Sequence, residues 1–169
     1  MFNVNDYIVY GTTGVCQVLE IRKEKDENNN EIQYYILQPV YNKTMKIKTP
    51  VDNDKVIMRS VITKEKVLSL IKSMPEQETV WIEDYRKRSE AYKAALRTAN
   101  CQEWIKIIKT LYQKKKEKTA EGKKLMKADE EIMKAAEKSL HEEFAVVLDI
   151  SPDEVPPFIL KHISSAISE

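Results

Sequence analysis

The sequence predicts an α+β protein of two domains, in which a small antiparallel β-barrel is followed by an α-helical bundle. Two of the chain's three glycines, Gly11 and Gly14, lie in one turn among the short apolar segments of residues 1–58. Residues 82–148 instead repeat apolar side chains at three- and four-residue steps and contain almost no glycine or proline. With 169 residues and a hydrophobic fraction of 42%, the chain is long enough for two small packed domains.

The first domain, residues 1–60, contains five segments with the alternation or the β-branched and aromatic content of strands. The expected strands are residues 7–10, 15–23, 32–38, 45–49 and 55–58. Five strands in under sixty residues indicate a five-stranded antiparallel barrel of SH3 or Tudor type. Such a barrel has little room for a catalytic pocket and more often binds a partner through an edge strand or an exposed face.

The second domain, residues 61–169, is expected to be helical. It begins with a linking helix over residues 61–75, for which Thr63 is the expected N-cap and Pro75 the stop. Apolar stripes predict three further helices, over residues 76–97, 101–117 and 119–149. We interpret these stripes as the core of a helix bundle.

A tail of residues 150–169 follows the bundle. Ser151, Pro152 and Glu154 have the spacing of a helix N-cap, N1 and N3, and predict a short helix over about 155–166. The tail packs on the bundle or mediates self-association through apolar side chains, which are Phe158, Ile159 and Ile163. We expect the protein to be a monomer.

The formal net charge of +1 conceals a segregation of charge along the chain. Residues 1–60 carry eight basic and eight acidic residues, whereas residues 85–127 carry fourteen basic and four acidic residues, an excess of +10. Basic charge concentrated on one helical segment is typical of a phosphate-binding face. A solvated helical surface is the alternative explanation.

Trp81 lies where the strand-like segments give way to the helical pattern, and it precedes the basic run of Arg86, Lys87 and Arg88. An aromatic side chain beside a basic cluster suits contact with nucleic acid, in which lysine and arginine hold phosphates. Because tryptophan is highly buried on average, packing between the two domains is the alternative.

The chain shows no constellation of residues for catalysis, and we predict that it is not an enzyme. Its two histidines, His141 and His162, have no cysteine or carboxylate at metal-ligand spacing, so we expect no metal. Three glycines are too few for a phosphate-binding loop alongside the turns, so we expect no cofactor. Cys16 and Cys101 lie far apart, which fits a reducing cytoplasm better than a disulfide framework.

Nothing in the sequence indicates a membrane protein. No run approaches the ~20 apolar residues that a membrane-spanning helix needs. The first six residues lack the basic and apolar regions of a signal peptide. We therefore expect a cytoplasmic location.

Several short motifs follow one another in a characteristic order. Residues 2–15 read Phe-Asn-Val-Asn-Asp-Tyr-Ile-Val-Tyr-Gly-Thr-Thr-Gly-Val, residues 45–50 alternate and end at a proline, and Trp81 precedes a basic helix and the run 119–125. In this order and spacing, from residue 1 to about residue 148, they resemble the CarD family of bacterial transcription regulators, also called CdnL. The opening is also similar to the RNA polymerase-interacting domain of transcription-repair coupling factor. Asn5 stands where the family usually has glycine.

The resemblance implies that the first domain binds the β subunit of bacterial RNA polymerase. Lys48 matches a polymerase-contacting basic position of the family, just before the proline. A second basic contact is expected at the end of the second strand, where Glu24 stands here. That glutamate is flanked by basic residues, which are Arg22, Lys23 and Lys25.

The resemblance also implies that the helical domain contacts promoter DNA, largely independently of its sequence, just upstream of the −10 element. Trp81 matches a tryptophan that wedges into the minor groove at the edge of the transcription bubble and so stabilises the open promoter complex. Further DNA contacts are expected from basic residues, which are Arg86, Lys87, Arg88, Lys123 and Lys124. Gly122 stands where the family usually has glutamate, so the capping box that begins at Thr119 is incomplete.

Two other functions compete with this one. A protein–protein adaptor without DNA contact, with a Tudor-like barrel and a helical docking domain, would bury Trp81. A nuclease or other DNA-modifying enzyme would need a carboxylate cluster, which the sequence does not show.

Overall fold

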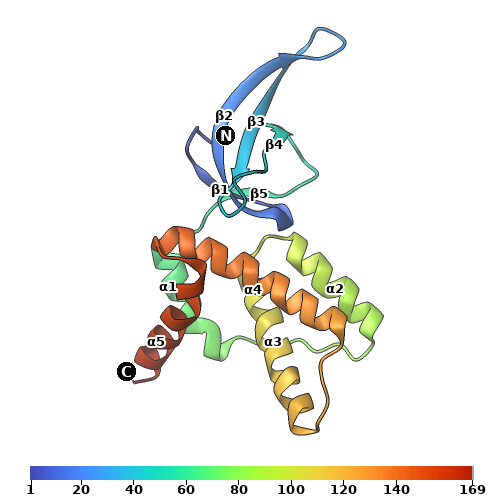
Figure 1. Cartoon of the computed structure of the whole chain (residues 1–169), viewed down its shortest axis with the longest axis vertical. Coiled ribbons are helices and arrows are strands. Elements are labelled where there is room, and N and C mark those ends of the chain that lie inside the picture. Colours follow the sequence, from blue (N-terminus) through green and yellow to red (C-terminus); the bar gives the residue numbers. More distant parts are fainter. Residues whose placement is uncertain (169) are drawn as a thin grey trace. The chain divides into compact units, whose positions relative to one another are not determined.

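The computed structural model describes residues 1–168, with side chains to residue 163, and divides into two compact units, Met1–Val61 and Ile62–Glu169. A five-stranded antiparallel sheet comes first and five α-helices follow it in the described part of the chain (Figure 1). The predicted α+β fold class is thus confirmed.

The sheet has the strand order β4-β3-β2-β1-β5 with antiparallel neighbours throughout. Its strands are β1 Tyr7–Tyr10, β2 Gly14–Lys25, β3 Glu31–Pro39, β4 Ile47–Pro50 and β5 Met58–Ser60. A register shift between Val18 and Glu20 makes a bulge in β2, and bulges bend and twist a strand. One face of the sheet encloses a core whose buried members are Ile8, Cys16, Val18, Tyr35 and Leu37.

The β2–β3 hairpin projects beyond this core (Figure 1). Its outer residues are paired and are exposed or half-buried, and charged side chains occupy both of its faces. This extension gives a chain with a small core a long charged ribbon at its surface.

The last strand begins at Met58, three residues later than the sequence predicts. The side chain of Asn53 accepts hydrogen bonds from the backbone nitrogens of Lys55, at 3.0 Å, and Val56, at 3.4 Å. Its amide also donates to the Val56 carbonyl at 2.8 Å. An asparagine that bonds its own downstream backbone favours a turn over a strand, which keeps Lys55 and Val56 in the loop.

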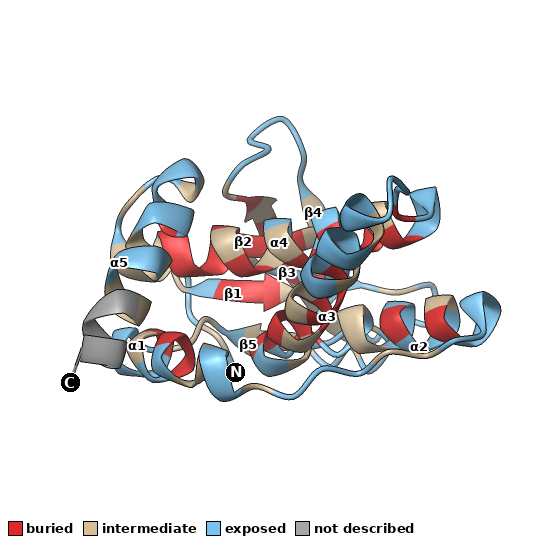
Figure 2. Cartoon of the chain, turned by 90° about the horizontal axis from the view of Figure 1, so that it is seen from below, coloured by how far each residue is buried: buried red, intermediate tan, exposed pale blue. Residues whose placement is uncertain are grey.

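The second unit is helical. Its helices are α1 Lys64–Ser73, α2 Tyr85–Arg97, α3 Cys101–Ala120, α4 Lys127–Leu148 and α5 Val155–Ser168. Thr63 is the N-cap of α1, as predicted, and its side chain accepts from the Lys66 nitrogen at 3.1 Å. The helices α3 and α4 pack along their buried residues, which include Trp104, Leu111, Ala136, Leu140 and Phe144 (Figure 2). Helix α5 packs against α1 and α4, with Val155 fully buried.

Helix α2 begins nine residues later than the sequence predicts. Asp84 is its N-cap and accepts from the backbone nitrogens of Arg86 and Lys87 at 3.0 and 3.1 Å. Residues 77–84 are outside any helix, so Trp81 lies in a non-helical segment that leads into α2. We call residues 77–84 the Trp81 segment.

The predicted boundary between the third and fourth helices is also wrong. Gly122, at φ 73°, ends α3 with the two bonds of a Schellman motif: its nitrogen donates to the Thr119 carbonyl and the Lys123 nitrogen to the Lys118 carbonyl. The Thr119 hydroxyl donates backwards to the Lys115 carbonyl at 2.8 Å and caps no helix. Gly122 therefore terminates α3 rather than weakening the start of α4.

Asn5 occupies a turn that requires a left-handed backbone. The Asp6 nitrogen donates to the Asn3 carbonyl at 3.1 Å, and Asn5, third in this turn, has φ 76°. Glycine adopts this conformation freely and asparagine tolerates it better than other residues. This geometry favours glycine at the position and tolerates the asparagine of this chain.

We predict that Asn5→Ala destabilises the first unit by about 1 kcal/mol, whereas Asn5→Gly leaves its stability equal or higher. Both tryptophans lie in the second unit, so the measurement is amide hydrogen exchange in β1 and β2 rather than tryptophan fluorescence. An equal loss in the glycine variant would show that the asparagine side chain, not the backbone angle, carries the effect.

Candidate functional site

Cations and an aromatic ring share one exposed face of the first unit. The Lys48 ammonium lies 4.4 Å from the ring centroid of Tyr34 and forms an ion pair with Glu24. The other oxygen of that carboxylate, Oε1, lies 3.9 Å from Nη1 of Arg22. We call Arg22, Glu24, Tyr34 and Lys48 the Lys48 face. It places one carboxylate between two cations.

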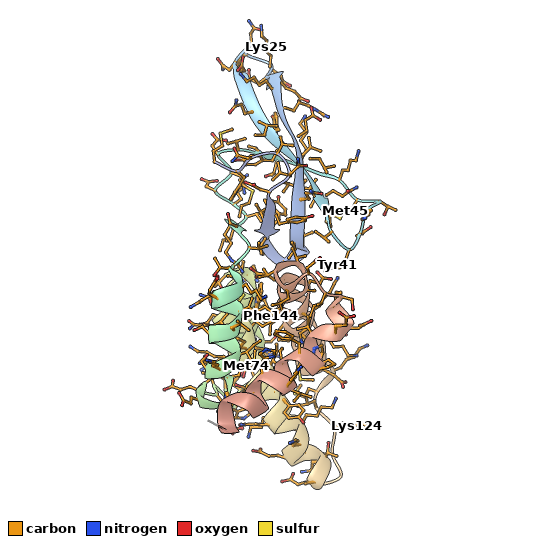
Figure 3. All side chains as sticks on the ribbon, turned by 90° about the vertical axis from the view of Figure 1, so that its left-hand side faces the viewer. Lys25, Tyr41, Met45, Met74, Lys124 and Phe144 are labelled. Carbon is orange, nitrogen blue, oxygen red and sulfur yellow. The ribbon has the colours of Figure 1, made fainter. Side chains whose placement is uncertain are left out.

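The four basic positions predicted on the first unit do not lie together. Successive side chains of a strand point to opposite faces, so Arg22 and Glu24 share one face of β2 while Lys23 and Lys25 share the other. Lys23 makes its own ion pair there, with Glu31 at 3.6 Å. Lys25 is at the end of β2 (Figure 3).

Arg22 is held by a second carboxylate. Its Nε and Nη2 donate to the two oxygens of Glu20 at 3.2 and 3.1 Å, a bidentate arrangement. This hydrogen bonding lowers the pKa of the Glu20 carboxyl. Arg22 thus has a fixed place on the Lys48 face that does not depend on Glu24.

The indole of Trp81 is half-buried between two cations of the second unit. The Arg88 guanidinium lies 4.2 Å from its ring centroid and the Lys114 ammonium 4.7 Å, both at cation–π distance. The indole nitrogen is buried and has no hydrogen-bond partner in the described part of the chain. The ring forms one wall of an open cavity of ≈ 390 Å³ whose other walls include Tyr85 and Lys118.

Arg88 is 3% exposed and every end of its guanidinium is occupied. Nε and Nη2 donate to the two oxygens of Asp129 at 2.9 and 2.8 Å. Nη1 donates to the carbonyl of Ile82 at 2.8 Å and, more weakly, to that of Glu83 at 3.3 Å. The expected DNA contact at Arg88 does not fit this geometry, because a buried and fully paired guanidinium has no donor left for a phosphate. Its observed role is to hold the Trp81 segment.

Three further side chains that the sequence analysis did not select also hold this segment. Thr110 accepts from the Val80 nitrogen at 3.0 Å, and the Tyr92 hydroxyl donates to the Val80 carbonyl. Burial raises the pKa of that tyrosine. At the start of the segment, the Lys109 ammonium donates to the carbonyls of Pro75 and Gln77 at 2.8 and 2.6 Å. Helical stripes gave no signal for these roles, since each partner is a backbone group distant in sequence.

The remaining basic residues predicted to contact DNA are exposed. Arg86 and Lys87 lie in the first turn of α2, which contains no acidic residue. Cations at the positive end of a helix disfavour it slightly, and they concentrate positive potential there. Neither makes an ion pair with any side chain up to residue 163.

Lys123 and Lys124 lie in the loop between α3 and α4 (Figure 3 labels Lys124), not at the start of a helix as predicted. Lys123 has a surface partner in Glu121 at 3.6 Å. The loop and the end of α3 line an open hollow of ≈ 560 Å³ with four lysines, which are Lys115, Lys123, Lys124 and Lys127. The structure thus gathers four ammonium groups around one hollow, together with the Glu130 carboxylate, which pairs with Lys115 at 3.5 Å.

Other kinds of site find no support in the described residues. No group of three or more His, Cys, Asp and Glu side chains there has the arrangement of a metal site. None of the described helices combines the length and the apolar character that crossing a membrane requires. Cys16 and Cys101 are both buried, in different units, and are not joined by a disulfide.

We predict that Asp129→Ala destabilises the second unit by about 3–5 kcal/mol, because it leaves the Arg88 guanidinium buried without its counter-ion. The neighbouring Glu130 is the matched control. It pairs with Lys115 at the surface, at 3.5 Å, so Glu130→Ala should cost less than about 1 kcal/mol. Denaturant unfolding followed by tryptophan fluorescence measures both, and equal losses would contradict a structural role for the buried pair.

Comparison with known proteins identifies the first unit. Residues 2–62 match the family model of the CarD-like/TRCF RID domain, in which RID denotes an RNA polymerase-interacting domain. The match spans all five strands and stops before α1. No curated protein matches the chain. The predicted resemblance is confirmed over this range.

Proposed function

Residues 2–62 are a CarD-like RNA polymerase-interacting domain, which makes the chain an RNA polymerase-binding transcription factor, and from this premise we propose its detailed role. It binds the β subunit of bacterial RNA polymerase through the first unit and contacts promoter DNA just upstream of the −10 element through the second. In this role it regulates transcription by stabilising the open promoter complex, as a monomer in the cytoplasm and at the nucleoid.

On the first unit, the proposed polymerase contacts centre on the Lys48 face. Lys48 and Arg22 are exposed there beside an aromatic ring, a combination that suits an acidic and partly apolar partner surface. Lys23 and Lys25 are on the other side of β2, so a single flat partner surface cannot contact all four cations.

On the second unit, the observation that carries the proposal is a half-buried tryptophan in a unit whose surface has several exposed cations. Arg86 and Lys87 lie in the first turn of α2, just after the Trp81 segment, and the lysine-lined hollow adds Lys123 and Lys124. In the proposed role these four contact phosphates without reading sequence, which makes the affinity depend on salt. Arg88 positions the tryptophan and does not itself contact DNA.

Trp81 is the proposed wedge. Insertion of an aromatic ring between base steps costs a few kcal/mol of unstacking, and least where the duplex is already distorted. The wedge therefore favours the melted over the closed promoter. To enter a groove the ring must leave the cavity beside Lys114, and its indole nitrogen, which is unpaired in the described structure, then becomes free to donate to DNA.

The half-burial of Trp81 also favours a second candidate, a protein–protein adaptor whose helical unit does not bind DNA. In that function the cations around the indole serve only to pack it. The two candidates differ in what happens when the ring is removed without disturbing its supports.

We predict that the protein lengthens the lifetime of the open complex formed by its cognate RNA polymerase, and that Trp81→Ala abolishes this effect while polymerase binding is unchanged. Trp81→Phe, which keeps an aromatic ring, should retain part of the effect. The measurement is the dissociation of open complexes after addition of a competitor. An unchanged lifetime with the intact protein would refute the wedge and favour the adaptor.

We also predict that Lys123→Glu together with Lys124→Glu weakens binding to promoter DNA. The affinity should also depend less steeply on salt, with the magnitude of the slope of log affinity against log salt reduced by about 2. The control reverses two exposed lysines of α1, Lys64 and Lys66, and changes the net charge equally. Binding titrations over a range of salt concentrations distinguish the two. An equal loss in both variants would mean that overall charge, not the loop, governs binding.

A further inference from the structure

The position between Lys48 and Arg22 is already occupied in the free protein. The carboxylate of Glu24 pairs with the Lys48 ammonium through one oxygen and approaches Arg22 at 3.9 Å through the other. All three side chains remain accessible, with 43% of Lys48, 38% of Glu24 and 44% of Arg22 exposed. A partner can therefore reach the same cations that Glu24 now neutralises.

The arrangement comes from three neighbouring strands and does not depend on flexible loops. In the sheet register, Arg22 is opposite Tyr34, Glu24 is opposite Ile32, and Ile36 is opposite Lys48. Lys48 consequently extends from β4 across the Tyr34 ring of β3 to reach Glu24 on β2. The strands fix the spacing of the charges.

The two cations differ in what else holds them. Arg22 keeps its bidentate bond to Glu20 whether or not Glu24 is present. Lys48 has Glu24 as its carboxylate partner and otherwise rests on the Tyr34 ring. Movement of Glu24 therefore exposes a positioned ammonium beside a fixed guanidinium, at a spacing that one carboxylate spans.

We propose that Glu24 is an internal competitor for the polymerase. On docking, a carboxylate of the partner takes the place of the Glu24 carboxylate between Lys48 and Arg22, so that binding exchanges one counter-ion for another. This inference rests on the proposed function and specifies the chemistry of the partner at the Lys48 face. Because exposed ion pairs contribute little net free energy, the exchange is nearly balanced, and Glu24 sets how tightly this contact holds.

The same exchange controls the response to salt. With Glu24 present, the cations attract few ions from solution, so docking releases few ions and screening changes the affinity weakly. Without its charge, the Lys48 ammonium attracts the partner carboxylate unopposed, while Arg22 keeps its pair with Glu20, and the attraction to Lys48 is screened by salt. Removal of the charge should therefore raise both the affinity and its salt dependence.

The test measures the dissociation constant of the full-length protein for its cognate RNA polymerase core enzyme between about 50 and 300 mM salt. Glu24→Gln should bind about threefold tighter at low salt, with a gain that shrinks as salt rises. The matched control is Glu31→Gln, which removes an equal charge from the pair with Lys23 on the opposite face of the same hairpin. Its affinity should stay within about a factor of 1.5 of wild type.

A double-mutant cycle ties the gain to the ammonium. In a Lys48→Met background, Glu24→Gln should give a smaller gain than in the wild type, because only Arg22 remains to be released.

Unchanged or weaker binding of Glu24→Gln would overturn the inference, and weaker binding would mean that Glu24 itself contacts a partner cation. An equal gain in Glu31→Gln would also overturn it, since bulk charge would then explain the effect. If the wild-type protein does not bind polymerase at all, the proposed function fails together with the inference.

Discussion

The buried ion pair between Arg88 and Asp129 is the constraint on which the second unit depends. It joins α2 to α4, and the remaining donors of the guanidinium hold the carbonyls of the Trp81 segment. A guanidinium removed from water needs all of its donors satisfied, so this one residue fixes the helix, its partner helix and the segment before it together. The tryptophan then rests on a support that cannot shift without exposing a buried charge.

Charge is used differently in the two units. On the first, each cation of the Lys48 face has a carboxylate close by, and the surface is nearly neutral over a few ångströms. On the second, Lys87 and Lys124 have no ion pair with any described side chain, and four lysines line one hollow against a single glutamate, Glu130. A balanced pattern discriminates between protein partners, whereas an unbalanced one suits a uniformly charged polyanion. The contrast agrees with a polymerase-binding unit joined to a unit proposed to bind DNA.

The positions at which α2 begins and α3 ends determine where the candidate residues of the second unit lie. Asp84 begins α2 only after Trp81, so the tryptophan lies on a non-helical segment. Both backbone groups of the preceding residue, Val80, are bonded to side chains of α2 and α3. Gly122 ends α3 and separates the lysine pair that follows from any helix. Each of these boundaries depends on one capping residue. The Asp84 side chain accepts from free backbone nitrogens of α2, and Gly122 adopts the left-handed backbone that lets main-chain nitrogens bond the last carbonyls of α3.

The sequence by itself determined the order of strands and helices, the Thr63 cap and the segregation of charge, because these depend on periodicity, local propensity and composition. The order and spacing of its motifs indicated the resemblance to the CarD family, which the family model confirms for residues 2–62. Alternation along β2 likewise determines that Arg22 and Lys23 point to opposite faces. Only the tertiary structure decided that Arg88 is buried while Arg86 and Lys87 are exposed, since its partner Asp129 is 41 residues away. It also decided the pairing of Lys48 with Glu24, 24 residues apart, because the register of three strands brings them together and no local pattern encodes that register.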